Sequence, residues 1–248
     1  MRICVISDVH FKYKHKSEAD RQNAALFLDF LSSSVGRYDL MVLNGDIFDL
    51  YNEWKYSIIR QYFPVYHLLA NIREAGCRIV FISGNHDFWF NGFLDKDLGI
   101  EVYHDQFYLE ADGMRMIFSH GDLYTSNDVR YQLFRRLIRQ PFIKWIFNLL
   151  HPELALFIGA KMSRSSRVRR VPGFMQSRRS QGLQSWAEKM ISRKKADIVV
   201  LGHSHRPGIH AMGGGHYANA GDWIKNHSYL EITDGSIKLI YHNKEKAQ

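Results

Sequence analysis

The sequence predicts an α/β fold in which two β-sheets pack against each other and helices cover them on the outside. Short apolar runs alternate with stretches of helical periodicity in the N-terminal part of the chain, a βαβ pattern that implies parallel strands. Further short strands joined by tight turns follow towards the C-terminal end. Between these two parts, basic residues gather in one segment that is predicted to be helical.

The N-terminal part predicts three strands and two crossover helices. The strands are Ile3 to Ile6, Asp39 to Asn44 and Arg78 to Ile82. Asp20 to Ser33 has apolar residues near helical spacing and predicts the first helix. Tyr56 to Ala75 predicts the second helix, kinked or broken at Pro64 because proline cannot donate a backbone hydrogen bond. This order of elements implies that the three strands pair in parallel.

The rest of the chain predicts a second group of strands. Asp112-Gly113 is typical of a hairpin turn and leads into the strand Met116 to Phe118, and Asp197 to Leu201 is another apolar strand. Three short antiparallel strands are then expected, at Tyr217 to Trp223, Tyr229 to Thr233 and Ile237 to His242. The last two are joined at Asp234-Gly235. We expect these strands to complete the second sheet.

The segment from Val129 to Lys195 interrupts the strands and carries most of the positive charge. It holds 16 basic and 2 acidic residues, whereas the whole chain has a net charge of +8. Its apolar residues recur at helical spacing, so we predict a helical basic insertion, or lid, within a single domain of residues 1–248. The alternative is a helical hairpin with its own core and a solvated basic face, and composition alone favours that alternative.

Composition indicates a reducing compartment. Cys4 and Cys77 lie in or beside predicted core strands and show no disulfide spacing. The N-terminus leads directly into a strand and shows no signal-peptide pattern. The apolar run Phe142 to Leu150 is interrupted by Lys144 and is too short to span a membrane. We therefore expect a cytoplasmic protein.

Five predicted strands each end at small residues followed by side chains that can bind a metal ion. These side chains are Asp8 and His10, Asp46, Asn85, His120, and His203 and His205. A single aspartate in such a position is usually a turn or helix-cap residue. Seven donors are harder to explain in that way, because a core does not accept so many polar groups without partners. The pattern predicts a metal centre of oxygen and nitrogen ligands where the strands end.

The five motifs, taken in order, resemble the motif set of the calcineurin-like metallophosphoesterases. They are Asp8-x-His10, Gly45-Asp46-x-x-Asp49, Gly84-Asn85-His86-Asp87, His120-Gly121-Asp122 and Gly202-His203-Ser204-His205. The resemblance implies two divalent metal ions that share Asp46, with Mn²⁺ expected ahead of Fe or Zn. The ligands of one ion would be Asp8, His10, Asp46 and His205, and those of the other Asp46, Asn85, His120 and His203.

The same resemblance implies hydrolysis at phosphorus, with two ions activating a water and holding the phosphate oxygens. His86 would then protonate the leaving oxygen or stabilise the equatorial charge. Asp49 would orient His86 through a hydrogen bond. The expected catalytic residues are therefore His86 and Asp49.

One branch of that family is similar beyond the metal motifs, namely the UDP-2,3-diacylglucosamine diphosphatases of lipid A biosynthesis. The similarity lies in Asp128-x-x-Tyr131, His151-Pro152 and Met162 to Arg167. It implies cleavage of the pyrophosphate of a nucleotide-sugar lipid, giving UMP and 2,3-diacylglucosamine 1-phosphate. The substrate-binding residues would be Asn85, His86, Asp128, Tyr131, Arg164, Ser166 and Arg167. The chain departs from this branch at His86, where its best-known members have arginine.

Two other functions stay open. A calcineurin-like phosphodiesterase or nuclease acting on another nucleotide or nucleic acid would also present a basic surface, because phosphate contacts dominate nucleic-acid affinity. Apolar residues interleaved with the arginines favour a lipid, so we do not expect nucleic acid as a partner. A non-catalytic scaffold of the same fold is the third interpretation, although no metal ligand is missing. The basic insertion is also expected to contact an anionic membrane, peripherally on the inner face of the inner membrane.

Overall fold

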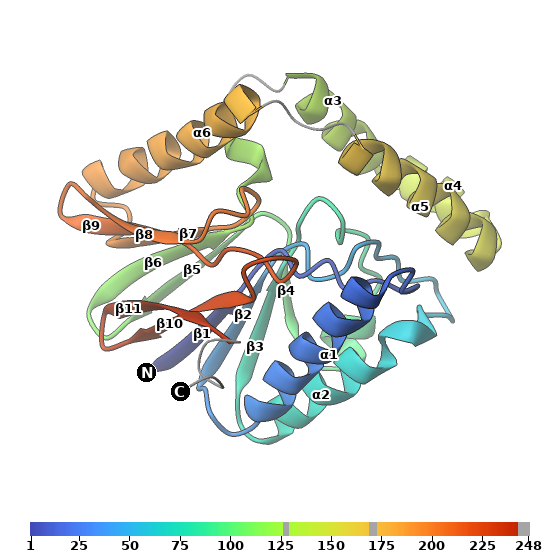
Figure 1. Cartoon of the computed structure of the whole chain (residues 1–248), viewed down its shortest axis with the longest axis horizontal. Helices are drawn as coiled ribbons and strands as arrows, with labels where there is room; N and C mark the ends of the chain where they lie inside the picture. Colours follow the sequence, from blue (N-terminus) through green and yellow to red (C-terminus); the bar gives the residue numbers. More distant parts are fainter. Residues whose placement is uncertain (126–128, 169–172, 243–248) are drawn as a thin grey trace.

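The strands of the described residues form two β-sheets that pack face to face, with helices on the outer faces (Figure 1). The computed structural model describes residues 1–125, 129–168 and 173–242, and only the backbone at 129–130, 162–168 and 173–179. The predicted fold class is confirmed by this layered arrangement. Apolar residues from the inner faces of both sheets form the central core, among them Val5, Val42, Phe118 and Val200.

The first sheet has the strand order β11-β10-β1-β2-β3-β4. Its strands are β1 (Arg2–Ile6), β2 (Leu40–Asn44), β3 (Arg78–Ile82), β4 (Glu101–Tyr103), β10 (Ser228–Thr233) and β11 (Ser236–Tyr241). Strands β1 to β4 pair in parallel, as the βαβ pattern predicted. Because parallel neighbours point the same way, the carboxyl ends of β1, β2 and β3 meet at one edge of the sheet.

The second sheet has the order β5-β6-β7-β9-β8. Its strands are β5 (Gln106–Ala111), β6 (Met114–Ser119), β7 (Ile198–Leu201), β8 (Gly208–Met212) and β9 (Gly215–Asn219). Strands β6, β7 and β9 are parallel, and β5 and β8 pair antiparallel at the edges. The predicted hairpin turn at Asp112-Gly113 joins β5 to β6, and both of its residues have positive φ.

The prediction for the last two strands was half correct. Asp234-Gly235 does turn β10 into β11, with both residues at positive φ. However, β10 pairs antiparallel with β1 and therefore extends the first sheet rather than the second. The physical reason is that β10 is buried on both faces, since Tyr229 packs against Phe30 of the outer helix while Leu230 joins the core between the sheets.

Two helices cover the outer face of the first sheet. Helix α1 (Glu18–Ser33) begins at Ser17, whose side chain accepts a hydrogen bond from the backbone of Asp20, and it buries Phe27 and Phe30. Helix α2 (Phe63–Glu74) follows the 3₁₀ turn η1 (Arg60–Tyr62). The expected helix over Tyr56 to Ala75 was wrong at its start, because Pro64 lies in the first turn and begins the helix instead of kinking it.

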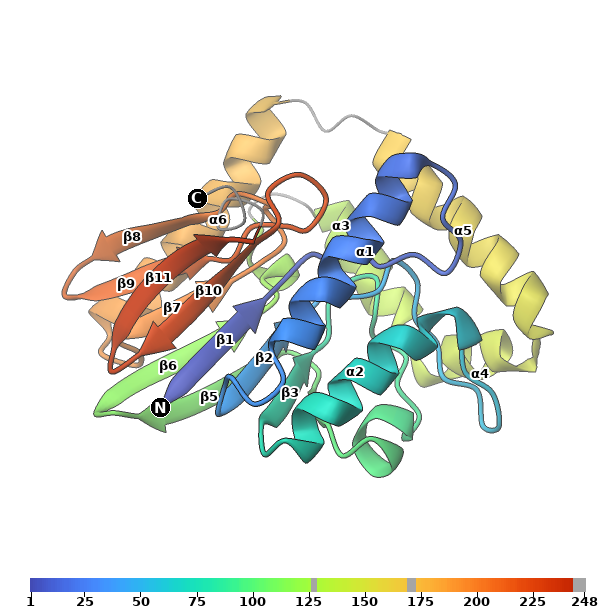
Figure 2. The same cartoon turned by 60° about the horizontal axis from the view of Figure 1, so that its bottom comes forward.

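The basic segment is helical, as predicted, and it divides into two parts. Helix α6 (Gly173–Ser192) covers the outer face of the second sheet, where Leu183, Ala187 and Ile191 are buried. The other part consists of α3 (Val129–Ile138), α4 (Pro141–Leu149) and α5 (Pro152–Val168), and we call these three helices the arm. Figures 1 and 2 show the arm apart from α6. Two short turns, η2 (Phe93–Asp97) and η3 (Asp122–Tyr124), complete the elements of the described chain.

Among the helices of the described residues, none combines the length and the apolar character that crossing a membrane requires. Cys4 and Cys77 are both buried, free thiols.

Candidate metal centre

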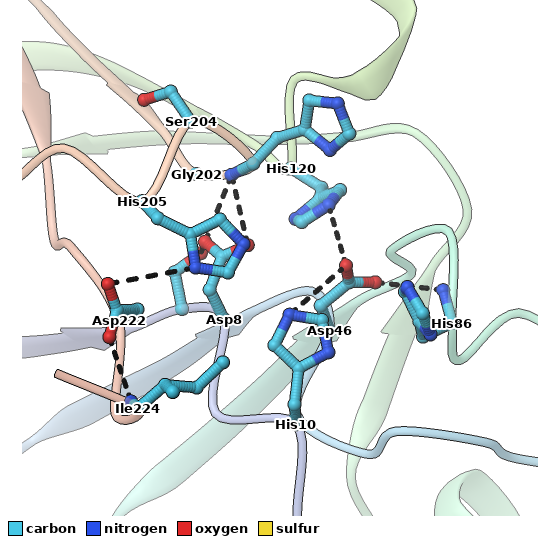
Figure 3. Close-up of polar contacts among 12 residues, drawn as sticks. Asp8, His10, Asp46, His86, His120, Gly202, Ser204, His205, Asp222 and Ile224 are labelled. Atoms are coloured by element: carbon cyan, nitrogen blue, oxygen red, sulfur yellow. Dashed lines mark hydrogen bonds and ion pairs between the residues drawn. The ribbon is translucent and has the colours of Figure 1, made fainter. Parts of the chain in front are cut away.

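The donor side chains that follow five strands converge, as Figure 3 shows for Asp8, His10, Asp46, His120 and His205. Asp8, His10, Asp46 and Asn85 come from the ends of β1, β2 and β3 in the first sheet, and His120, His203 and His205 come from β6 and β7 in the second. The backbone turns sharply at most of these positions. Positive φ values, uncommon for residues other than glycine, occur at Asp8, His10, Asp46, His203 and His205. Such strain concentrates at functional sites, where surrounding structure holds it in place.

Glycines make this close approach possible. At Gly84, an added Cβ would lie 2.9 Å from Cγ of Asp46 and closer to its Oδ1. At Gly45, it would lie 2.6 Å from Nδ1 of His120, and at Gly202 it would lie 2.8 Å from Oδ2 of Asp8. Side chains other than hydrogen would therefore occupy the space in which the donors gather.

The donors form two groups that meet at Asp46. In one group, Nε2 of His205 is 3.4 Å from Oδ1 of Asp8, and the ligand atoms of Asp8, His10 and His205 lie within 4.8 Å of one another. In the other group, the ligand atoms of Asp46, His120 and His203 are equally close. The Asp46 carboxylate oxygen Oδ2 is 3.4 Å from Nε2 of His120 and 3.8 Å from Nε2 of His10, so it lies between the groups.

Asn85 completes the second group. Its Oδ1 lies 3.2 Å from Nε2 of His120 and 3.0 Å from Nδ1 of His203. The structure thus brings together all seven side chains that the sequence analysis proposed as ligands. Oxygen and nitrogen donors of this kind, without thiolate, suit a divalent first-row metal ion.

The electrostatics of the centre favour positive charge. Asp46 is buried, which by itself raises its pKa, but the imidazoles of His120 and His86 bring that pKa well below its usual range. Burial lowers the pKa of His120, yet the Asp46 carboxylate more than offsets this and raises it to about 10. In the same way, Asp8 and Asp222 raise the pKa of His205 to about 9 against the effect of burial. A cluster that binds protons so firmly also suits a metal cation, so the residues present fit the metal ions that the motifs imply.

His86 lies beside this cluster and its orientation is fixed. Its Nδ1 is 2.9 Å from the backbone oxygen of Asp49 and 3.8 Å from the Asp49 carboxylate, while its ring is 4.8 Å from the ring of His10. A carbonyl oxygen can only accept, so Nδ1 of His86 carries the hydrogen. Nε2 is then the ring atom available for another partner. The backbone N–H of His86 also donates to Oδ1 of Asp46 at 2.8 Å.

Asp87 holds the loops of the site together, a role that sequence reasoning did not assign. Its buried carboxylate accepts backbone N–H groups from both ligand-bearing loops, namely those of Asp46 (3.0 Å), Ile47 (2.6 Å), Phe48 (3.1 Å) and Gly84 (2.9 Å). Burial, followed by the nearby Asp46 carboxylate, raises the pKa of Asp87 to about 7. The feature of the sequence that could have identified Asp87 is its position directly after Asn85 and His86.

Asp122 connects the centre to the arm. Its Oδ2 accepts a hydrogen bond from the hydroxyl of Tyr131 at 3.0 Å and forms an ion pair with Arg135. Directly after the last residue of α3, Arg139 donates through Nη2 to the backbone oxygen of Gly84 at 2.6 Å. Residues of α3, together with Arg139 after its end, therefore contact the loops that carry His120 and Asn85.

The structure describes the side chains of only some of the residues predicted to bind substrate. Asn85 and His86 lie in the centre, and the ring of Tyr131 is 6.2 Å from the ring of His203. Asp128 lies outside the described residues. Arg164, Ser166 and Arg167 fall near the end of α5, where their side chains lie outside the described part of the chain.

The rest of the arm packs on loops near the centre and exposes apolar side chains elsewhere. Nε1 of Trp89 donates to the backbone oxygen of Ile138 at 3.2 Å, and Asn52 bonds Asn148 at 3.0 Å. Nine large apolar side chains among the described residues of the arm are exposed: Leu133, Phe134, Leu137, Phe142, Trp145, Ile146, Leu149, Leu154 and Phe157. Apolar exposure on this scale is typical of a surface that meets another apolar surface.

Comparison with known proteins adds a family and its relatives. A family model described as calcineurin-like phosphoesterase matches residues 1–207. A protein of Aliivibrio fischeri (strain MJ11) named UDP-2,3-diacylglucosamine hydrolase is 25% identical over 259 residues, covering 99% of each chain. A protein of the same name from Haemophilus influenzae (strain PittGG) is 26% identical over 237 residues, covering 93% of this chain and 94% of its own. An archaeal phosphodiesterase of solved structure shares the fold, with a TM-score of 0.50 at 13% identity over 97% of this chain and 99% of that one.

Proposed function

The chain belongs to the calcineurin-like phosphoesterase family, as its motifs predicted, and we propose that it hydrolyses the pyrophosphate of UDP-2,3-diacylglucosamine. The products are UMP and 2,3-diacylglucosamine 1-phosphate. Relatives named UDP-2,3-diacylglucosamine hydrolase, 25 to 28% identical over more than nine-tenths of the chain, support this substrate. The observation that carries the proposal is the arm. Its arginines contact the loops that carry the proposed metal ligands. Its exposed apolar side chains suit a lipid.

Two divalent ions, with Mn²⁺ as the proposed native metal, would be held by the two donor groups. Asp8, His10, Asp46 and His205 would hold one, and Asp46, Asn85, His120 and His203 the other. Asp46 is the sensible bridge because its carboxylate lies between the groups and offsets the repulsion of two cations. When bound, such a pair of ions supplies Lewis acidity at phosphorus and an activated water.

His86 is the proposed general acid. With Nδ1 donating to the backbone oxygen of Asp49, Nε2 would deliver a proton to the leaving phosphoryl oxygen, or donate to an equatorial one, when both ring nitrogens carry a hydrogen; the ring then keeps the hydrogen on Nδ1. Asp49 orients the ring through that carbonyl and its nearby carboxylate. His86 therefore acts on the substrate while the donors of the cluster hold the metal ions.

Arginines on α3 and at its C-terminal end are proposed to bind the substrate phosphates. Arg135 lies on α3 and Arg139 directly follows its last residue, and both side chains are largely buried beside the centre. Arg135 is paired with Asp122, whereas the nearest carboxylate to Arg139 in the described chain is that of Asp105, 4.0 Å away. Guanidinium groups placed in this way suit a diphosphate, and Tyr131 lies at the same face.

The exposed apolar side chains of the arm are the proposed contact for the acyl chains and for the membrane that contains them. Phe142 and Trp145 of α4 are 64% and 57% exposed, with ring centroids 6.0 Å apart. Basic residues of the same segment would favour an anionic leaflet. Co-sedimentation with phosphatidylglycerol vesicles tests this part, with a Phe142→Ser, Trp145→Ser double variant expected to bind about tenfold more weakly. Binding that ignores both the anionic lipid and the double substitution would refute it.

The substrate is tested by presenting three phosphoesters to the Mn²⁺-loaded protein. These are UDP-2,3-diacylglucosamine, a short DNA duplex and bis(p-nitrophenyl) phosphate. UMP release from the first, with little or no cleavage of DNA, is the expected result. Cleavage of DNA without UMP release would overturn the substrate and favour the nuclease alternative.

A further inference from the structure

The connection between β9 and β10 lies against the metal centre, although it is outside residues 1–207 that the family model matches. Asn219, the last residue of β9, donates through Nδ2 to the backbone oxygen of Gly202 at 3.0 Å and to Oγ of Ser204 at 3.1 Å. The backbone N–H of Trp223 donates to the backbone oxygen of Asp8 at 3.2 Å. This connection therefore supports the turns that carry the ligand residues of both sheets.

Asp222 is the residue of this connection that faces a proposed ligand (Figure 3). Its Oδ2 is 3.7 Å from Nδ1 of His205. The carboxylate is only 4% exposed and is held firmly, because Oδ1 accepts the backbone N–H groups of Ile224 (2.8 Å) and Lys225 (2.7 Å) and Oδ2 accepts from Nδ2 of Asn226 (2.7 Å). A carboxylate fixed by backbone donors cannot follow the imidazole, so the imidazole must take its orientation from the carboxylate.

The opposite edge of the His205 ring faces Asp8, with Nε2 3.4 Å from Oδ1. The ring thus lies between two carboxylates, one inside the proposed metal centre and one behind it. From this geometry we propose that Asp222 is a positioning residue, which holds the hydrogen of His205 on Nδ1 and leaves the Nε2 lone pair directed at a metal ion. The inference rests on the proposed metal centre and concerns the ion that Asp8, His10 and His205 would hold.

An outer carboxylate of this kind acts by fixing the tautomer and direction of a ligating imidazole. Loss of such a partner typically costs about 10 to 100-fold in metal affinity. The effect should be confined to one of the two ions, because among the proposed histidine ligands in the described residues Asp222 contacts His205, whereas His120 and His203 are paired with Asn44 and Asn85.

Asp222→Asn tests the inference by metal binding rather than by turnover. Asparagine keeps an oxygen for the backbone N–H groups of Ile224 and Lys225 but removes the charge behind His205. Competition with a chromogenic chelator, using Mn²⁺ and Zn²⁺, should show one of two ions bound 10 to 100-fold more weakly. Asp29→Asn is the matched control. Asp29 lies on α1, away from the centre, and its Oδ2 also contacts a histidine, at 3.0 Å from Nε2 of His242. This control should bind both ions as the wild type does.

The wild-type protein provides a measurement that does not depend on folding of a variant. Two-bond ¹H–¹⁵N correlation spectra of the Zn²⁺-loaded protein should show His205 with its hydrogen on Nδ1. A hydrogen on Nε2, or two ions bound with unchanged affinity by Asp222→Asn, would overturn the inference and leave the metal centre standing. A wild-type protein that binds neither Mn²⁺ nor Zn²⁺ would remove the metal centre and this inference together.

Discussion

Replacing Gly84 by alanine is expected to displace Asp46, the carboxylate proposed to bridge the two metal ions. The new Cβ would lie 2.9 Å from Cγ of Asp46, and closer still to its Oδ1 and to its backbone nitrogen. Restoring an ordinary carbon–carbon separation of ~3.5 Å requires a shift of at least about 0.6 Å. Metal–ligand distances tolerate only about 0.2 Å. We therefore expect the bound metal to fall to one ion per chain or fewer, and kcat to fall by about 100-fold.

The cause of this loss can be separated from backbone strain and from general instability. Gly84 does not have the left-handed backbone that disfavours alanine, so the effect comes from the contact alone. Overpacking costs about 1 to 3 kcal/mol, which for a chain of this size lowers Tm by about 2 to 12 °C. The variant should thus stay folded at 25 °C, and a thermal melt checks this.

The assay is elemental analysis of metal per chain after Mn²⁺ loading and gel filtration, together with turnover of bis(p-nitrophenyl) phosphate. Gly208→Ala is the matched control, because its nearest neighbour is Nε2 of His210 at 3.0 Å, the end of a side chain that can move. The control should match the wild type in both measurements. Metal content and kcat of Gly84→Ala within twofold of the wild type would show that the loop yields instead of Asp46, and would refute the reasoning.

Further predictions concern the proposed acid, the bridge and the arm. His86→Ala should lower kcat by about 100-fold or more while elemental analysis still finds two ions, and unchanged turnover would remove its role as an acid. Asp46→Ala should lose metal and turnover together, so an inactive variant that retains both ions would contradict the bridge. Arg139→Met leaves the backbone oxygen of Gly84 without its charged donor, which at about 2 kcal/mol lowers Tm by about 4 to 8 °C. The exposed Arg21→Met should leave Tm within about 1 °C, and equal melts for the two variants would contradict the anchoring of α3.

The sequence was sufficient for features that depend on local pattern. Apolar runs separated by helical periodicity predicted β1, β2 and β3 and their parallel pairing, and polar residues directly after those runs predicted which donors would converge. That convergence follows from topology alone, because the carboxyl ends of parallel strands lie at one edge.

Features that depend on distant partners were not accessible in the same way. The pattern of β10 identifies a strand buried on both faces but does not say that its neighbour is β1, more than 220 residues earlier in the chain. Asp222 and His205 are 17 residues apart and meet because β7 and β9, which they follow, pair in parallel and end at the same edge of the sheet. Arg139 reaches Gly84 from the C-terminal end of α3, and the arginine-rich sequence of that helix equally suits a solvated face.

The donors of the metal centre come from both sheets, and this has a consequence for the stability of the whole molecule. A cation held jointly by Asp46 and His120 could stay bound only while the two sheets remain packed. Its binding would therefore stabilise the packing of one sheet on the other. Free ion at about 100 times its Kd would add about 2.7 kcal/mol to the free energy of unfolding. A chelator would then lower the stability of the fold as well as remove the proposed catalytic ions.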